Sequence, residues 1–267
     1  MHRFTSPAAA RATTARPSSG AVAIIPARLQ STRLPEKALQ DLGGAPLIVR
    51  VLARVRAATA VEDVVVATDS DRIAAAVRAA GGKAILTRSD HPSGLDRVAE
   101  AERLLAGETA ADDGAVVLNV QGDEPYVNPE GLDRLVRLFD RTDVAMATLA
   151  APFRAGEDPD DPNRVKVVVD RAGRALYFSR SRVPHGADPD HPALLHVGVY
   201  AYRRATLRAL AALPPCPLER AERLEQLRAL WNGIAIHVAV GDFHSIGIDT
   251  PADLERARAQ WGERRDP

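Results

Sequence analysis

The chain has 267 residues, of which 46% are hydrophobic and 26% are charged, and its formal net charge at pH 7 is zero. A neutral chain has no global attraction to nucleic acid or to an anionic membrane, and no apolar run approaches the roughly 20 residues that span a bilayer. The single Cys216 excludes an internal disulfide and a cysteine metal site, which fits a reducing compartment, so we expect a cytoplasmic protein.

The first twenty residues differ in composition from the rest of the chain. They carry three arginines, many Ser, Thr, Ala and Pro residues, and no acidic residue. Such a segment cannot form a core, so we expect residues 1–20 to be a disordered extension and residues 21–267 to form a single domain. The extension also resembles an organelle transit peptide, although its amphipathic pattern is poor. A bacterial tail or a misplaced start codon is the alternative.

A short apolar run, Ala21 to Ile25, predicts a strand buried on both faces of a parallel sheet. The loop after it carries Arg28, Arg33 and Lys37 and has no glycine from Pro26 onward. Glycine-rich phosphate loops bind anions with their backbone N–H groups, so in this loop any phosphate must be bound by side chains instead. Three cations would offset most of the roughly four negative charges of a nucleoside triphosphate. A solvated basic loop is the other interpretation.

Strand and helix patterns alternate beyond this loop. We expect helices over 45–58, 73–80, 95–105 and 129–140 and strands over 64–68, 84–86, 116–120 and 143–150. Asp69 or Ser70 can cap the second of these helices. This alternation predicts a three-layer, Rossmann-like α/β fold with a mostly parallel central sheet.

Two later loops carry candidate ligand-binding residues. Ser93 precedes a helix, where backbone N–H groups can bind an acceptor on a base or a phosphate, and Arg88 lies nearby. His91, in the same loop, is expected to be a packing residue. Asp123 ends a buried strand beside a glycine, which makes it a plausible Mg²⁺ ligand or, alternatively, a helix cap. Glu124 is expected to point elsewhere.

The second half of the chain predicts a hairpin, with strands over 165–169 and 175–179, and then a strand over 196–203. His196 and Tyr200 share one face of that strand. They could form the polar wall of a site for a polyhydroxylated ligand, or they could be core residues.

Beyond that strand the pattern predicts an amphipathic helix over 217–228, with Leu224, Leu227 and Trp231 on its apolar side, and a strand over 234–240. Asp249 precedes a last helix, where Asp-Thr-Pro is also a strong N-cap signal.

Four motifs carry a family resemblance: Pro-Ala-Arg-x-x-Ser-Thr-Arg-Leu-Pro-x-Lys, Gln-Gly-Asp-Glu-Pro, Tyr-Phe-Ser-Arg and Leu-Glu-Gln-Leu-Arg. Together they resemble the 3-deoxy-manno-octulosonate (Kdo) cytidylyltransferases, and the similarity runs from about Val22 to Trp261. The resemblance implies the nucleotidyltransferase fold, with a smaller hairpin and helix subdomain, inserted at about 152–232, that forms a homodimer interface. It also implies transfer of CMP from CTP to the anomeric hydroxyl of Kdo, with pyrophosphate and CMP-Kdo as products, for lipopolysaccharide synthesis.

The resemblance also implies roles for individual residues. The catalytic residues would be Arg28, Lys37, Asp123 and Asp249; the nucleotide would be bound by Arg28, Arg33, Lys37, Arg88, Ser93 and Gln121; and the sugar acid would be bound by Arg180, His196, Tyr200, Glu225 and Gln226. Asp123 and Asp249 would share one Mg²⁺, because two carboxylates about 4 Å apart repel by roughly 4 kcal/mol at an effective dielectric of 20.

One position departs from the family pattern. Leu95 stands where the resemblance expects a threonine against the cytosine, and a lost hydrogen bond there would weaken nucleotide binding by about 1 kcal/mol. Two alternatives therefore stay open: a cytidylyltransferase for another acid, such as 8-amino-Kdo or a sialic acid, and a catalytically silent nucleotide-binding paralogue.

Overall fold

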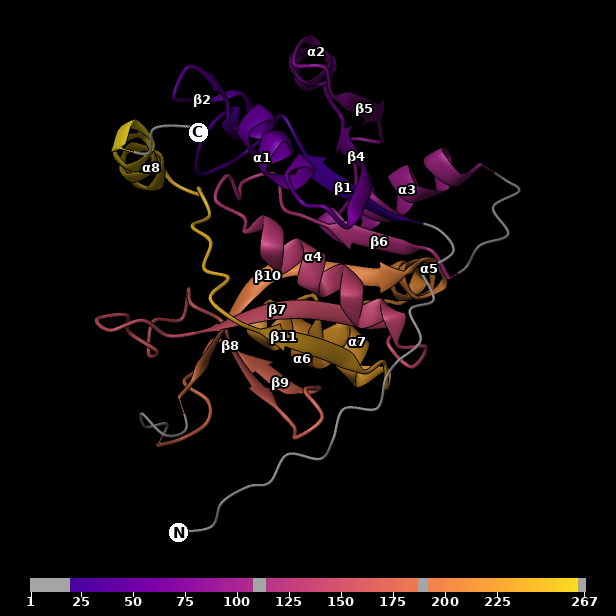
Figure 1. Cartoon of the computed structure of the whole chain (residues 1–267), viewed down its shortest axis with the longest axis vertical. Helices are drawn as coiled ribbons and strands as arrows, with labels where there is room; N and C mark the ends of the chain where they lie inside the picture. The colour runs from indigo at the N-terminus through magenta and orange to yellow at the C-terminus, as the bar shows by residue number, and fades with distance from the viewer. Residues whose placement is uncertain (1–19, 108–113, 187–191, 264–267) are drawn as a thin grey trace.

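A computed structural model describes residues 20–107, 114–186 and 192–263 (Figure 1). The predicted disordered extension or transit peptide therefore falls on residues outside the described part, apart from Gly20. Within the described ranges, every helix is too short or too polar to cross a bilayer.

The chain alternates between strands and helices over most of its length. The strands are β1 Ala21–Ala27, β2 Asp41–Leu42, β3 Ala45–Pro46, β4 Val61–Thr68, β5 Lys83–Leu86, β6 Val116–Asn119, β7 Met146–Pro152, β8 Lys166–Val169, β9 Ala175–Ser179, β10 Leu194–Arg203 and β11 Ile236–Val240. The α-helices are α1 Leu47–Arg56, α2 Asp71–Ala79, α3 Gly94–Ala106, α4 Pro129–Arg137, α5 Arg204–Ala212, α6 Pro217–Glu222, α7 Leu227–Trp231 and α8 Pro251–Glu263; two 3-10 helices span Lys37–Leu39 and Leu138–Asp140.

Nine of the described strands form one sheet, with β1 near its middle (Figure 1). The order is β11-β7-β10-β6-β1-β4-β5, and the hairpin β8–β9 joins it through β10. The neighbours of β1 and β4 run parallel to them, and β11 runs parallel to β7. Only β10 enters this order antiparallel to both neighbours. The predicted mostly parallel sheet is confirmed.

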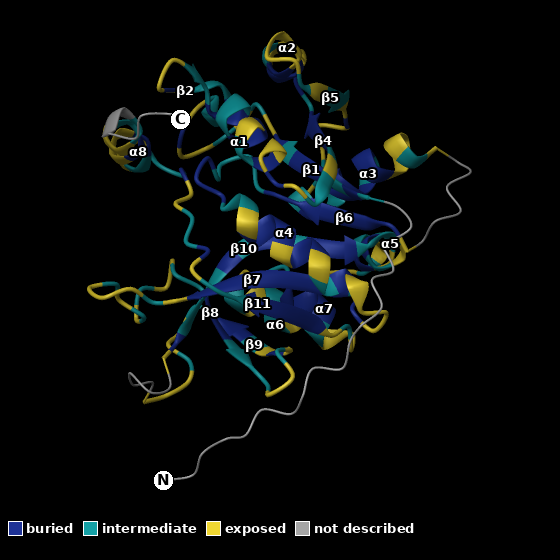
Figure 2. Ribbon diagram, viewed as in Figure 1, coloured by how far each residue is buried: buried dark blue, intermediate teal, exposed yellow. Residues whose placement is uncertain are grey.

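Helices cover both faces of this sheet, which gives the predicted three layers. Ile25 of β1 packs in a core with α1, α2 and α4, whereas Ile24 packs in a second core with α3, α5 and α7. Both isoleucines are fully buried, because a central parallel strand has no solvent face. Figure 2 shows the strands of the sheet as the buried layer, with exposed residues on the outer sides of the helices.

A third, smaller apolar cluster lies between α8 and the β2–β3 hairpin. It consists of Leu34, Leu42, Leu47, Tyr126, Ile248, Leu254 and Ala257, with Trp261 packed against it. These residues come from both ends of the chain. The cluster therefore holds the C-terminal helix against the segments that follow β1 and β6.

The predicted helix over 217–228 is wrong. It is broken into α6 and α7 at Arg223, whose φ of 54° is left-handed. The break brings Arg228 and Glu219 into an ion pair of 2.6 Å, whereas a straight helix would separate residues nine positions apart by about 13 Å along its axis. Leu224 and Leu227 are buried as predicted, but Trp231 at the end of α7 is 56% exposed.

Candidate active site

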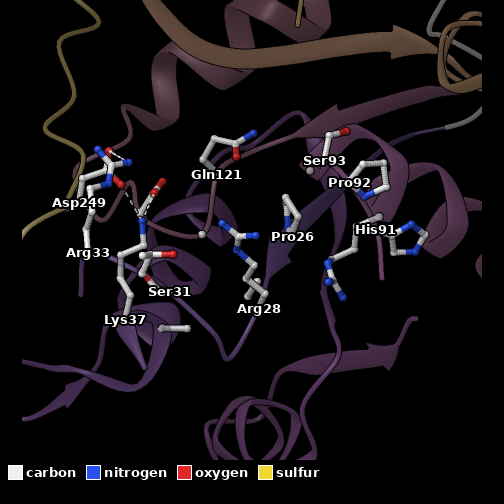
Figure 3. Close-up of a pocket in the computed structure, with 17 residues that line it drawn as sticks. Pro26, Arg28, Ser31, Arg33, Lys37, His91, Pro92, Ser93, Gln121 and Asp249 are labelled. Carbon is white, nitrogen blue, oxygen red and sulfur yellow. Dashed lines mark hydrogen bonds and ion pairs between the residues drawn. The ribbon is translucent and has the colours of Figure 1, made fainter. Parts of the chain in front are cut away.

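A pocket of about 490 Å³ opens at the carboxyl ends of the central strands. The predicted residues that line it are Arg28, Arg33, Lys37, Ser93, Gln121, Asp123 and Asp249. Figure 3 shows Arg33, Lys37 and Asp249 at one end and Ser93 with His91 at the other, while Arg28 and Gln121 lie between them. The pocket is therefore elongated, with cationic and acidic groups gathered at one end.

The pairing of β1 with β6 explains why two of these loops meet. The strands are parallel neighbours, with Ile24 opposite Asn119, so the loops after them leave the same edge of the sheet. Gly122 then packs directly on the first loop, because a Cβ at this position would lie only 2.7 Å from the carbonyl oxygen of Pro26. The glycine beside Asp123 thus lets one loop approach the other.

Asp249 reaches the same edge from the far end of the chain. The Ile248 N–H donates to the carbonyl oxygen of Asp123 at 3.0 Å, and the Ile248 side chain is fully buried in the third cluster. Thr250, rather than Asp249, caps α8, since its hydroxyl accepts from the Asp253 N–H at 3.2 Å. The Asp249 carboxylate is therefore available to the pocket.

Lys37 lies between the two carboxylates. Its Nζ is 2.5 Å from Asp123 Oδ2 and 2.9 Å from Asp249 Oδ1, and Arg33 Nη2 is 3.2 Å from Asp249 Oδ2. Burial lowers the pKa of Lys37, but the two carboxylates outweigh it and hold this pKa above its ordinary value. Since both oxygens contact one ammonium, Asp123 and Asp249 are close enough to share a cation, as expected from the sequence.

Glu124 points away from this group, as predicted. Its Oε2 accepts a hydrogen bond from the Ser245 hydroxyl, which lies in the segment that leads to Asp249. Burial, helped by the charge of Asp123, raises the pKa of Glu124 to about 7. The residue therefore ties two segments of the site together and is not part of the group formed by Lys37, Asp123 and Asp249.

A second group of polar residues forms around β10. His196 and Tyr200 have ring centroids 5.5 Å apart on the same face, and Phe178 packs edge-on against His196 at 5.0 Å. Burial lowers the pKa of His196 to about 3, so its ring is neutral near pH 7. The Thr148 hydroxyl lies 3.0 Å from His196 Nε2 and donates its hydrogen to the Val199 carbonyl at 2.7 Å. Nε2 therefore carries the ring hydrogen, and Nδ1 is an acceptor.

Glu225 connects this second group to the pocket. It lies close enough to Ser93, which lines the pocket, for that side chain to act on the pKa of Glu225; burial, and after it the charge of Glu225, raises the pKa of Tyr200. Burial also raises the pKa of Glu225 itself. Among the described residues, Glu225 Oε1 and the neighbouring Gln226 Nε2 are buried polar atoms without a hydrogen-bond partner. Buried polar atoms are nearly always paired, so these two are suited to a polar ligand.

Comparison with known proteins decides the family. The model of the cytidylyltransferase family matches residues 22–236. The chain belongs to the cytidylyltransferase family. It is 48% identical over 239 residues to the 3-deoxy-manno-octulosonate cytidylyltransferase of Rhodopseudomonas palustris (strain HaA2), which covers 88% of this chain and 95% of that protein. It is 49% identical to the enzyme of the same name from Bradyrhizobium sp. (strain ORS 278), over 88% of this chain and 94% of that protein.

A solved cytidylyltransferase gives the same result for the fold. The structure of CMP:2-keto-3-deoxy-manno-octonic acid synthetase complexed with CTP superposes with a TM-score of 0.83 at 42% identity. The superposition covers 92% of this chain and 99% of that one. The family and the nucleotidyltransferase fold predicted from the four motifs are both confirmed.

Two predicted binding residues, Arg88 and Arg180, belong neither to the pocket nor to the polar group around β10. The Arg88 guanidinium is 68% exposed and pairs with Asp90 at 2.6 Å. Arg180 donates to the backbone carbonyls of Glu222 at 2.7 Å and Pro162 at 2.9 Å, so its guanidinium holds protein segments together. In this arrangement neither arginine faces the other site residues.

Position 95 does not behave as the sequence suggested. Leu95 is 1% exposed, packs in the core under α3, and is not among the pocket's lining residues. A leucine at position 95 therefore removes no side-chain contact from the pocket lining. The structure gives no support to the predicted weakening of nucleotide binding.

Sequence reasoning missed several residues of the pocket. Ser31 and Thr32, in the first loop, and Arg97, in the first turn of α3, all line it. Their place directly beside predicted residues could have indicated this. His91 also lines the pocket, while its ring is hydrogen-bonded to Glu100 as a packing residue would be.

Proposed function

We propose that this chain transfers CMP from CTP to the anomeric hydroxyl of Kdo and releases pyrophosphate. The observation that carries the proposal is the group formed by Lys37, Asp123 and Asp249 at the cationic end of the pocket. The two relatives that are about half identical carry the name of this activity, and the solved relative was crystallised with CTP.

The first loop supplies the charge that a triphosphate needs. Arg28 and Arg33 are exposed on the pocket wall, so their guanidinium groups are free to turn toward phosphate oxygens. Lys37 adds a point charge close to both carboxylates. At the other end Ser93 begins α3, and Gln121 lies between the two ends (Figure 3). The nucleotide base would lie toward Ser93, and the phosphates toward Lys37.

Asp123 and Asp249 fit a divalent cation. Carboxylate oxygens are the ligands that Mg²⁺ prefers, and Mg²⁺ usually takes only one or two of them and completes an octahedron with phosphate oxygens and water. The described residues contain no cluster of three or more His, Cys, Asp or Glu side chains that could hold a metal, which agrees with such a sparse protein contribution. Bound there, Mg²⁺ would neutralise charge that develops on the triphosphate.

The β10 group supplies the acid-binding half. His196 Nδ1 is a neutral acceptor, Gln226 Nε2 is a donor without a hydrogen-bond partner among the described residues, and Glu225 Oε1 accepts no hydrogen bond from them and is only 3.9 Å from Arg228 Nη2, so together they match the hydroxyls of a sugar acid. The proximity of Glu225 to Ser93, which lines the pocket, supports a position for this half beside the nucleotide. Arg180 is left out of this proposal, because its guanidinium is engaged by backbone carbonyls.

The chemistry follows from positioning. The anomeric hydroxyl loses its proton to solvent as its oxygen attacks the α-phosphorus of CTP. The new P–O bond forms as the bond from the α-phosphorus to the bridging oxygen breaks, and pyrophosphate leaves with that oxygen. Phosphoryl chemistry of this type depends on alignment and charge neutralisation rather than on a protein nucleophile. Arg28, Arg33 and Lys37 would hold the triphosphate in line, while His196 and Glu225 would orient the acid.

We propose further that the chain is a homodimer that makes CMP-Kdo for lipopolysaccharide synthesis in the cytoplasm. Leu176 on β9 and Trp231 on α7 are 60% and 56% exposed, and such large apolar side chains are suited to a protein interface. Light scattering on the purified chain tests the dimer: a dimeric mass is expected, and a monomer at micromolar concentration would contradict it.

A pyrophosphate-release assay with CTP, Mg²⁺ and a panel of acids tests the activity. We expect pyrophosphate to be released faster with Kdo than with 8-amino-Kdo or a sialic acid. Asp123→Ala should lower turnover by at least about a hundredfold, because it removes a carboxylate that stabilises charge in the transition state. Unchanged turnover of that variant would contradict the metal assignment. CTP binding by calorimetry without release from any acid would favour a silent paralogue.

A further inference from the structure

Asp69 has a place in the site that no motif suggested. It directly follows β4, which lies between β1 and β5 in the sheet, and its side chain is 12% exposed. Although Asp69 was a candidate cap for α2, Ser70 takes that position by accepting from the Ile73 N–H. The carboxylate of Asp69 is therefore not used as the cap of α2.

Both oxygens of Asp69 are used. Oδ1 accepts from the Leu29 N–H at 3.1 Å, and Oδ2 is 3.1 Å from Arg97 Nη2. Arg97 in turn donates through Nη1 to Thr87 Oγ1 at 2.6 Å, and its side chain is 5% exposed. Leu29, Asp69 and Thr87 each stand just beyond one of three adjacent strands, β1, β4 and β5. The contacts thus tie these strand ends to the first turn of α3.

Fold stability alone does not account for this arrangement. Buried ion pairs seldom repay the cost of removing two charges from water, and apolar residues of similar size often stabilise a fold equally well. What the Asp69–Arg97 pair does is fix geometry. Leu29 lies between the cations of the first loop, and Arg97 lines the pocket near Ser93. The pair therefore joins the part of the first loop next to Arg28 to the wall of the pocket near Ser93.

We infer that Asp69 is a positioning residue for CTP, an inference that rests on the proposed function. Through the Leu29 N–H it holds the loop that carries Arg28, and through Arg97 it holds the wall at the start of α3. Because the Leu29 N–H is occupied by Asp69, it is not available to a phosphate, which agrees with a loop that binds anions through side chains. The position of the Arg28 segment relative to the start of α3 is then set before CTP arrives.

The test is a double-mutant cycle on CTP affinity, measured by calorimetry without acid and by steady-state kinetics with Kdo. Asp69→Asn keeps an oxygen for the Leu29 N–H but turns an amide N–H toward Arg97, so the pair is broken at constant volume. We expect the Kd and KM for CTP to rise about tenfold or more, since bonds to charged groups are the stronger ones. The KM for Kdo should change less than about threefold. The double variant with Asp69→Asn and Arg97→Met should bind CTP no more weakly than Arg97→Met alone, because Arg97→Met has already removed the pair.

Asp133 provides a matched control. It is a buried carboxylate that also uses both oxygens, accepting from Thr59 Oγ1 at 2.8 Å and from the Ala60 N–H at 2.7 Å, but it lies on α4 away from the pocket. Asp133→Asn should lower the melting temperature and leave the KM for CTP unchanged. If Asp69→Asn behaves in the same way, or impairs CTP and Kdo equally, the inference is wrong.

Thr87→Val covers the case in which Asp69→Asn does not fold. It removes only the Arg97 contact at 2.6 Å and should raise the Kd for CTP about threefold; an unchanged Kd would overturn the inference. The proposed function fails separately: a wild type that binds CTP but releases no pyrophosphate leaves the affinity cycle valid. A wild type that does not bind CTP refutes both.

Discussion

Lys37 is the residue whose replacement perturbs the charges of the site most. In Lys37→Met the apolar stem stays, but the ammonium that contacts Asp123 at 2.5 Å and Asp249 at 2.9 Å is lost. The two carboxylates then face each other without a cation between them. We predict that the variant is less stable than the wild type and that, unlike the wild type, it is stabilised by Mg²⁺ in the absence of nucleotide.

The magnitude follows from exposure. Lys37 and Asp123 are 18% and 26% exposed, so their charged hydrogen bond should contribute about 1.5–3 kcal/mol. Asp249 is 48% exposed, so its pair with Lys37 adds less than about 1 kcal/mol. At about 2–4 °C per kcal/mol for a chain of this size, a total of about 1.5–4 kcal/mol should lower the melting temperature by roughly 3–16 °C.

The assay is thermal unfolding of both proteins with and without millimolar MgCl₂. The wild type should respond little to Mg²⁺, because its ammonium already lies between the carboxylates, whereas Lys37→Met should regain part of the lost stability. Arg33→Met is the control: Arg33 is 67% exposed and its pair with Asp249 should be worth under about 1 kcal/mol. A Lys37→Met variant with the melting temperature of the wild type, unchanged by Mg²⁺, would refute the reasoning.

Two further predictions concern the acid-binding half. Since the pKa of His196 is about 3 in the fold against 6.5 unfolded, only the unfolded chain gains a proton as the pH falls through 6.5, so stability is lost on acidification. Urea denaturation should show the wild type losing about 2 kcal/mol more than His196→Asn between pH 7 and pH 4.5, and equal losses would contradict the buried neutral ring. Arg180→Met should lower the stability by about 2 kcal/mol, because its carbonyl contacts are lost, with little change in the KM for Kdo. A large rise in that KM at unchanged stability would instead support the role that the sequence suggested.

Patterns of local sequence predicted the strands and most helices, because buried parallel strands and amphipathic helices leave strong periodicities. They failed at residues 217–228, where the chain turns at Arg223 and pairs Arg228 with Glu219, a contact between two short helices that the helical spacing does not reveal. Leu95 shows the same limit, since sequence identity alone does not reveal that position 95 faces the core.

The candidate site was predictable where a motif lies at a strand end. Arg28, Lys37 and Asp123 follow β1 and β6, and neighbouring parallel strands bring such loops together. Asp249 could be placed only by family resemblance, because its approach depends on the third apolar cluster and on the Ile248 N–H. The role of Asp69 was missed because a carboxylate just before a predicted helix is typical of an N-cap residue.

The central claim is that loop cations and two carboxylates distant in sequence act on one triphosphate. A crystal of the protein grown with CTP and Mn²⁺, measured at the manganese edge, tests it most directly. The account predicts an anomalous peak about 2.1 Å from an oxygen of both Asp123 and Asp249, with Lys37 moved from between them to a phosphate. A peak that contacts only one of these carboxylates, or a Lys37 that still bridges them, would contradict it.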